Sequence, residues 1–294
     1  MTPRPASAKA SADHPVAGIA WMLAGVGIFC INDALGKWLV VKYPVGELLL
    51  IRSAAALIVL IPFLCNAGVA AFVAAPRPML QVARIVVSAF EVAMFFLAVS
   101  YLPLADVSTF YLATPIYVTV LSAPLLGERT GWRRGTAVAA GFVGVVLALR
   151  PSPATFTMPA LIAVGGSLFF AVLLVTTRLL RNTAQMVLIS GQLVATLMLG
   201  AVSAAFGWVA PPLLDFLLLV LFGVLSVVAL ACVNHALRLA PASVIVPYQY
   251  TMIIWAVVLG FVVFGDVPDL LTLVGAAIII AAGLCIFWLE RLRR

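Results

Sequence analysis

Two stretches of the sequence decide the fold: LPLADVSTFYLATPIYVTVLSAPLLGERTGWRRG at residues 102–135 and APASVIVPYQYTMIIWAVVLGFVVFGDVPD at residues 240–269. Residues 98–128 align without gaps on residues 236–266. Few aligned positions are identical, but each copy is an apolar run that starts at a proline and ends at a glycine followed by an acid. These ordered landmarks predict an internal duplication.

The composition around these stretches excludes a water-soluble fold. Of the 294 residues, 65% are apolar and only 9% are charged, against roughly 25% charged in a typical globular chain. The mean hydropathy is +1.23, so apolar faces would remain exposed to water everywhere. We therefore expect a membrane protein, and we exclude a disordered chain, a disulfide scaffold and a sizeable catalytic domain outside the membrane.

Apolar runs long enough to cross the bilayer recur along nearly the whole chain, since a helical span needs roughly 20 residues. They are continuous and lack the two-residue alternation of membrane strands, which excludes a barrel. We expect an all-α fold with a disordered tail at residues 1–15. The ten expected spans are residues 16–38, 45–65, 80–101, 104–126, 134–150, 159–179, 185–207, 213–238, 241–264 and 269–289.

The basic residues predict the orientation of these spans. Of the 17 Lys and Arg residues, thirteen fall on the face that would hold both termini, three fall on the opposite face, and Arg52 lies within a span. Because positive residues favour the cytoplasmic side, we expect both termini in the cytoplasm. The net charge of +7 is then a consequence of topology, and we expect no nucleic-acid partner.

The duplication divides the chain into two halves, residues 16–150 and 159–289. Each half has five spans, an odd number, so the second copy must enter the membrane from the opposite side. Inverted repeats of this kind occur in many secondary transporters, whose binding sites lie near the midplane between the halves. The sequence therefore predicts a transporter with a central site.

Charged residues at bilayer depth are expensive and must face a partner or water. Glu91 lies near the middle of its span and is either a cavity-lining site for an amine or proton, or a structural glutamate that ties helices together. Arg52 is either an outer-gate ion partner or an arginine that extends toward the interface with Glu47. Asp33 and Lys37, four residues apart, are expected to form a surface pair.

Further polar residues are gating or coupling candidates. Asn32 could face a cavity, while Asn234 and His235 lie one turn from a cytoplasmic helix end, where they could form an inner gate or a helix interface. Scattered cysteines and only two histidines predict neither a metal site nor a cofactor. The absence of any catalytic set predicts that the chain is not an enzyme.

Aromatic residues concentrate in the fourth and ninth spans, which are also interrupted by Pro115 and Pro247. Kinked aromatic helices suit a pocket for neutral or zwitterionic molecules with apolar groups, although aromatic packing alone is the alternative. With Glu91, the cavity candidates are Phe110, Tyr111, Tyr248, Gln249, Tyr250 and Trp255.

On the two quoted stretches, and on GFVGVVLALRP at residues 141–151, the chain resembles the drug/metabolite transporter superfamily of EamA type. The resemblance implies ten spans in two repeats and export of amino acids or other small metabolites, with the bacterial aromatic amino-acid exporters as the nearest likeness. Related sequences often carry arginine where this chain has Gln249, so the resemblance does not imply an anionic substrate bound at that position.

We therefore expect a monomeric exporter in the bacterial inner membrane that moves amino acids, aromatic ones among them, by alternating access around a central cavity. Its expected partners are a small-molecule substrate and the lipid bilayer. The same fold could instead carry nucleosides, S-adenosyl compounds or drugs. A membrane-embedded enzyme or scaffold is a third reading that no motif supports.

Overall fold

The computed structural model describes residues 15–73, 76–102, 104–127, 131–149, 157–259 and 270–291. The described part is helical throughout and its elements follow the expected spans closely. The expected tail lies outside the described residues except for Pro15, which begins the first helix. The uninterrupted helices are α1 (Pro15–Val40), α2 (Val45–Val73), α3 (Pro78–Tyr101), α6 (Trp132–Leu149), α7 (Met158–Leu179), α8 (Gln185–Ala204), α9 (Leu213–Leu239) and α12 (Leu270–Arg291).

The fourth and ninth spans are interrupted, each near a proline. The fourth consists of α4 (Leu104–Tyr111) and α5 (Thr114–Leu126), and Pro115 lies in the first turn of α5. The ninth begins with α10 (Ala242–Ile245), continues as the 3₁₀ helix η2 (Val246–Thr251), which contains Pro247, and ends with α11 (Met252–Leu259). Proline lacks the amide hydrogen that a continuous helix needs, so these spans bend at the centre of the protein.

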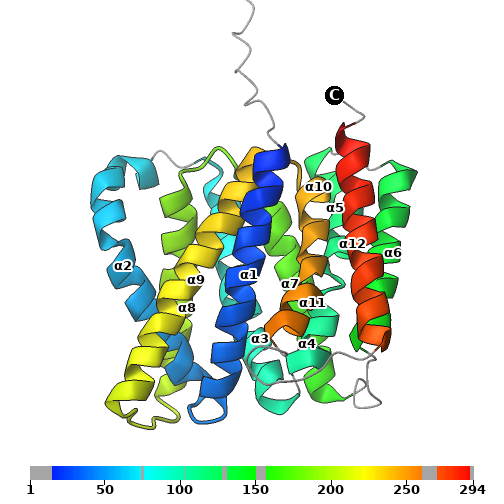
Figure 1. The fold of residues 1–294 in the computed structure, drawn as a ribbon. Coiled ribbons are helices and arrows are strands. Elements are labelled where there is room, and N and C mark those ends of the chain that lie inside the picture. Colours follow the sequence, from blue (N-terminus) through cyan, green and yellow to red (C-terminus); the bar gives the residue numbers. More distant parts are fainter. Residues whose placement is uncertain are drawn as a thin grey trace, which may run out of the picture.

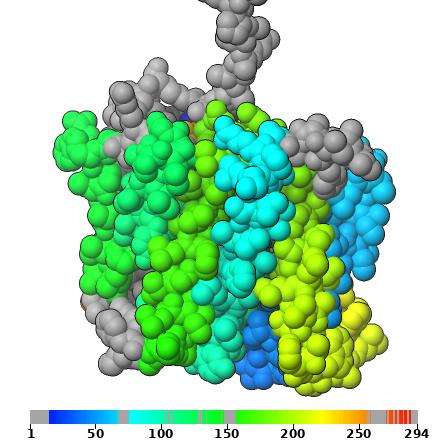
Figure 2. Space-filling model, turned by 180° about the vertical axis from the view of Figure 1, so that it is seen from behind, coloured from blue at the N-terminus to red at the C-terminus, as the bar shows by residue number. Residues whose placement is uncertain are grey.

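The ten spans cross a membrane. Six helices are individually long and apolar enough to do so: α1, α2, α3, α7, α8 and α9. Seen from behind, α7, α3 and α8 lie side by side and form one continuous surface (Figure 2). Large apolar side chains of these helices are exposed, among them Val86 and Phe90 of α3, Leu161 of α7 and Met198 of α8, as expected for helices in contact with lipid chains.

The helices pair across the two halves in a reciprocal pattern. The first helix of one half packs against the third of the other in both directions, as α1 with α9 and as α3 with α7. The second helices pack together as α2 with α8, and the fifth as α6 with α12. A pseudo-twofold relation between halves produces such exchange, and α1 accordingly begins at the same end of the molecule at which α12 finishes (Figure 1).

Small residues allow these cross-half pairs to approach closely. A Cβ atom placed on Gly25 of α1 would lie 2.8 Å from Val233 Cγ2 of α9, and one placed on Gly200 of α8 would lie 2.6 Å from the backbone nitrogen of Leu50 on α2. Membrane helices associate largely through such backbone proximity. The two halves therefore form one body around the space between them.

Candidate functional site

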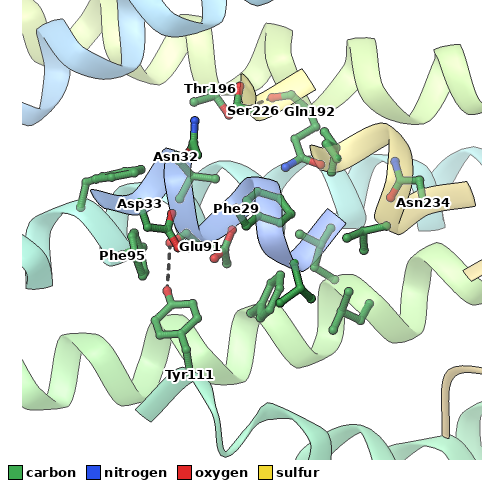
Figure 3. Close-up of a pocket in the computed structure, with 18 of the residues that line it drawn as sticks. Phe29, Asn32, Asp33, Glu91, Phe95, Tyr111, Gln192, Thr196, Ser226 and Asn234 are labelled. Carbon is green, nitrogen blue, oxygen red and sulfur yellow. Dashed lines mark hydrogen bonds between the residues drawn. The ribbon is translucent and has the colours of Figure 1, made fainter. Parts of the chain in front are cut away.

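A cavity lies between the two halves at the centre of the protein. The cavity has a volume of about 100 Å³, and its walls come from α1, α2, α3, α4, α7, α8, α9, η2 and α11. The close-up shows α1 carrying Phe29, Asn32 and Asp33 along the cavity, with Glu91 of α3 beside them (Figure 3). Both repeats thus contribute walls, as expected for a transporter site at the repeat interface.

Three ionisable groups line this cavity: Asp33 of α1, Arg52 of α2 and Glu91 of α3. Glu91 and Arg52 are each only 7% exposed. The three groups interact electrostatically, yet the ion pairs of 4.0 Å or less between described residues do not include any two of them. Two carboxylates and one guanidinium therefore share the cavity without direct contact.

Arg52 is held by aromatic rings rather than by hydrogen bonds. Its guanidinium carbon lies 4.6 Å from the ring centre of Phe222 and 5.5 Å from that of Phe96. Its Nε and Nη1 atoms are buried and have no hydrogen-bond partner in the described chain. The two rings also pack against α1 at Gly36, where a Cβ atom would collide with both. The arginine is thus stabilised as a charge while its donors remain unused.

Aromatic side chains form the wall around the carboxylates. The ring of Phe95 meets those of Phe96 and Tyr111 edge-on, with centres 5.0 Å apart in both pairs, and Tyr111 lies 5.8 Å from Phe170. The Tyr111 hydroxyl donates a long, 3.4 Å hydrogen bond to the backbone carbonyl of Glu91 (Figure 3). The wall is therefore apolar but carries a hydroxyl close to the acidic groups.

The lining from the second half carries polar but uncharged side chains among apolar ones; we call these polar residues the polar wall. It includes Gln192 and Thr196 of α8, Ser226 and Asn234 of α9, and Gln249 of η2. The Thr196 and Ser226 hydroxyls donate to backbone carbonyls in their own helices. The Asn234 Nδ2 and Gln249 Oε1 atoms are buried without a partner in the described chain. This wall can exchange hydrogen bonds with a ligand, but it adds no charge.

A second buried arginine, Arg84 of α3, lies behind that wall. It is 1% exposed and donates hydrogen bonds to Thr177 Oγ1 at 2.8 Å, to the Leu188 carbonyl at 2.9 Å and to Gln192 Oε1 at 3.5 Å. Thr177 and Gln192 both line the cavity. Arg84 therefore ties the first half to the second and positions two cavity residues.

The end of the molecule opposite the termini is closed by a group of polar contacts, which we call the distal seam. Asp215 at the start of α9 accepts a hydrogen bond from the Tyr43 hydroxyl at 2.6 Å and pairs with Lys42 at 3.2 Å. Glu47 of α2 accepts from the backbone nitrogen of Val209 at 2.9 Å. The bond to Asp215 raises the pKa of Tyr43 to about 12, because losing the proton would place two negative charges together.

The distal seam also uses Lys37, whose Nζ donates to the carbonyls of Val99 and Leu102 at 2.6 and 3.1 Å. The expected surface pair between Asp33 and Lys37 is therefore absent, because Lys37 satisfies the C-terminal carbonyls of α3 and Asp33 turns to the cavity. Arg52 likewise lies in the cavity instead of reaching Glu47.

The cavity brings together part of the set expected from the sequence: Asn32, Arg52, Glu91, Tyr111, Asn234 and Gln249. Of these, Asn32 is already engaged, since its Nδ2 donates to the Phe222 carbonyl at 2.8 Å. It therefore joins α1 to α9 and has its acceptor oxygen left for a ligand.

Five other expected residues lie away from the cavity lining. Phe110, Tyr248 and Tyr250 pack into apolar clusters, and the Tyr250 hydroxyl donates to the Val138 carbonyl at 3.1 Å. Trp255 packs over α1 at Gly27. The ring of His235 meets Trp21 edge-on with centres 5.1 Å apart.

Sequence reasoning missed the cavity role of Asp33 and the bonding of Arg84. A signal for Asp33 was present, because Val26, Phe29 and Asp33 are spaced by three and four residues and share one helix face. Arg84 and Arg178 belong to the thirteen basic residues expected at the cytoplasmic face, but both are buried, and Arg178 donates to the Leu237 carbonyl at the end of α9. Nothing in the sequence around these two residues distinguishes a buried, hydrogen-bonded arginine from an exposed one.

No group of three or more His, Cys, Asp or Glu residues is placed to hold a metal ion within the described ranges. The site thus consists of two carboxylates, one arginine, an aromatic wall and a polar uncharged wall. Enclosed between two inverted halves of a multi-pass membrane protein, it defines a carrier for a small molecule.

Comparison with known proteins gives the family. The model of the EamA-like transporter family matches residues 16–150 and 157–288, and the chain belongs to that family. It is a transporter and not an enzyme. A solved crystal structure superposes with a TM-score of 0.78 over 95% of this chain and 99% of the other, at 18% identity, which supports the fold.

Three relatives illustrate what the family carries. An S-adenosylmethionine uptake transporter of Rickettsia bellii is 26% identical over 93% of this chain and 94% of its own length. A riboflavin transporter of Vibrio cholerae is 25% identical over 91% of each chain. A pseudopaline exporter of Pseudomonas aeruginosa is 27% identical over 86% of this chain and 90% of its own. The relatives thus carry small metabolites and do not single out aromatic amino acids.

Proposed function

We propose that the chain is a secondary transporter for an organic metabolite that carries more positive than negative charge, of the S-adenosylmethionine type. The observation that carries this proposal is the formal charge of the cavity. Asp33 and Glu91 supply two negative charges and Arg52 one positive charge, so the ionised cavity has a charge of −1. S-adenosylmethionine has an ammonium, a sulfonium and a carboxylate, and its charge of +1 balances that of the cavity.

The aromatic wall supports the same class of substrate. A sulfonium or ammonium centre gains energy over the faces of aromatic rings, and a flat base can stack on Phe95, Tyr111 or Phe170. The polar wall formed by Gln192 and Asn234 offers an amide donor and acceptor to a base edge. One molecule with a cationic chain and a heteroaromatic ring would use all three parts of the cavity.

The alternative substrates can be ranked by how well their charge balances that of the cavity. A neutral flavin would leave the three charges unbalanced. The amino-acid cargo expected from the sequence fits the aromatic wall, but a zwitterion with no net charge leaves one carboxylate uncompensated. We therefore place S-adenosyl compounds before amino acids, in a bacterial inner membrane with both termini in the cytoplasm, and we propose alternating access as the mechanism.

Uptake by reconstituted vesicles tests this assignment. Purified protein in proteoliposomes should take up labelled S-adenosylmethionine saturably, and an excess of unlabelled compound should compete. Glu91→Gln and Asp33→Asn should each lower uptake at least about tenfold, since charged hydrogen bonds contribute about 1.5–3 kcal/mol each. Asp215→Asn makes the same chemical change outside the cavity and should retain uptake.

Two results would overturn the assignment. One is saturable uptake of neutral amino acids with none of S-adenosylmethionine, which would restore the amino-acid reading. The other is wild-type uptake by both folded carboxylate variants, which would show that the cavity charge does not select the cargo. Melting curves of each variant confirm that loss of uptake is not loss of folding.

A further inference from the structure

Arg52 is a buried cation with an unusual environment. It lies in the cavity wall, is 7% exposed, and forms no hydrogen bond with the described residues. Burying hydrogen-bond donors without partners is costly, and the other two arginines found buried among the described residues, Arg84 and Arg178, avoid that cost by bonding to carbonyl and side-chain oxygens. The bonding of Arg52 is therefore incomplete in this state.

The surroundings of Arg52 leave its donors free for an incoming acceptor. The rings of Phe96 and Phe222 stabilise the positive charge and consume no N–H group. The Nε and Nη1 atoms are also out of reach of water, so the guanidinium must turn toward the cavity to bond. That movement breaks no hydrogen bond, whereas the same movement of Arg84 would break three.

The acids within the cavity do not fill this role. Asp33 and Glu91 both interact with Arg52 electrostatically, but neither forms a direct ion pair with it. Separated charges of both signs in one cavity match a ligand that itself carries separated charges of both signs. The planar guanidinium can donate two parallel hydrogen bonds to a carboxylate, a geometry that no other side chain of the described lining provides.

We propose that Arg52 binds the carboxylate of the transported molecule, and that Asp33 and Glu91 bind the cationic groups of the same molecule. The required feature of the substrate is then a head group with a carboxylate next to a cation, as in an α-amino acid. This inference rests on the proposed transport function, but it does not require that the cargo be S-adenosylmethionine.

A pair of ligands that differ only in the carboxylate isolates the role of Arg52. S-adenosylmethionine and its decarboxylated form share the base, the sulfonium and the amine. Wild-type protein should bind the carboxylate form about tenfold to a hundredfold more tightly, the range expected for a charged hydrogen-bonded pair. Competition binding in detergent measures the ratio of the two dissociation constants.

Arg52→Gln should reverse that preference. Without the guanidinium the cavity has a formal charge of −2, which suits the decarboxylated ligand with its charge of +2. Arg52→Lys keeps the charge without the paired donors and should give an intermediate ratio. Glu91→Gln serves as the matched control, because it should weaken both ligands and leave the wild-type direction of preference intact.

The outcomes separate this inference from the proposed function. Equal binding of the two ligands by wild type, or an unchanged ratio in folded Arg52→Gln, overturns the role of Arg52. If neither S-adenosyl ligand binds, the cargo assignment fails, and the measurement is repeated with phenylalanine against phenethylamine and with lysine against cadaverine. Loss of preference on Arg52→Gln in either pair supports the carboxylate role, and no preference in any pair overturns it. If Arg52→Gln does not fold, the ratio measured for Arg52→Lys decides instead, and an unchanged ratio in that variant overturns the role of Arg52.

Discussion

Two arginines are buried in adjacent helices of the first half, and their surroundings differ completely. Arg84 of α3 is 1% exposed and donates to three groups on α7 and α8. Arg52 of α2 is 7% exposed and donates to none, although two phenylalanine rings cover it. The difference separates a cation that fixes the frame of the protein from one that is available to a ligand.

Replacing each arginine by methionine should give the largest difference in thermal stability between the two sites. Arg84→Met removes three hydrogen bonds between the two halves and leaves Gln192 Oε1 without its donor, and a buried polar group without a partner costs about 1–3 kcal/mol. We expect a clear loss of thermal stability and of folded yield. Arg52→Met breaks no hydrogen bond among the described residues, although it leaves Asp33 and Glu91 without a nearby cation, so its melting temperature should fall less than that of Arg84→Met.

Thermal unfolding in one detergent, followed by fluorescence, compares these two variants directly. An equal loss of stability in both would mean that Arg52 is also part of the frame, and the distinction drawn above would be wrong. Because both variants replace arginine by methionine, a difference in side-chain volume cannot explain a difference in stability between them.

Adjacent glycines on α7 offer a second, smaller effect. A Cβ atom on Gly166 would collide with the Tyr111 hydroxyl, whereas one on Gly165 would meet only the mobile end of Met94, at 3.1 Å. Gly166→Ala should therefore displace Tyr111 from the Glu91 carbonyl, at a cost of about 1–3 kcal/mol for overpacking, and weaken substrate binding severalfold. Gly165→Ala is the control.

Binding constants and melting curves of the two alanine variants should thus diverge. Similar binding by both would indicate that the Tyr111 wall does not contact the substrate. The comparison of Gly165→Ala with Gly166→Ala thus tests whether the substrate contacts Tyr111, which only the second substitution displaces.

The distal seam should give the smallest effect, because Lys42 is 42% exposed and exposed ion pairs contribute little. Asp215→Asn should lower the melting temperature by only about one to two degrees. Since the pKa of Tyr43 is raised to about 12 from about 10 in an unfolded chain, the stabilisation by its proton is complete below pH 10. It is lost as the pH rises toward 12.

Difference absorbance of tyrosinate during alkaline titration measures this shift. In Asp215→Asn one tyrosine should ionise at lower pH than in wild type, and Tyr43→Phe should remove that difference. A titration identical in wild type and Asp215→Asn would contradict the hydrogen bond between Tyr43 and Asp215.

Most of the fold could be predicted from the sequence, because apolar length and proline position are local properties. The ten spans, the two halves and the bends near Pro115 and Pro247 all follow from them. The sequence does not predict that the ninth span becomes a 3₁₀ helix over Val246–Thr251. That choice depends on packing against α1 and α12, which no local pattern records.

The site was less accessible to sequence reasoning. Glu91 and Tyr111 could be picked out because a carboxylate and a hydroxyl are conspicuous at bilayer depth. Tyr248 and Tyr250 were expected beside them, but the 3₁₀ geometry changes which side chains share a face, and both pack into the apolar cluster instead. The distinction between Arg52 and Arg84 depends wholly on partners in distant helices.

Gly36 of α1 bears on how the substrate of such a cavity can change during evolution. The rings that cover Arg52 rest against this residue of α1, where even one methyl group would displace them. The reach of the guanidinium can therefore be reset by a single mutation that alters no charge. Lineages that inherited this duplicated frame could acquire new cargoes by such small steps, and the frame could outlast many changes of substrate.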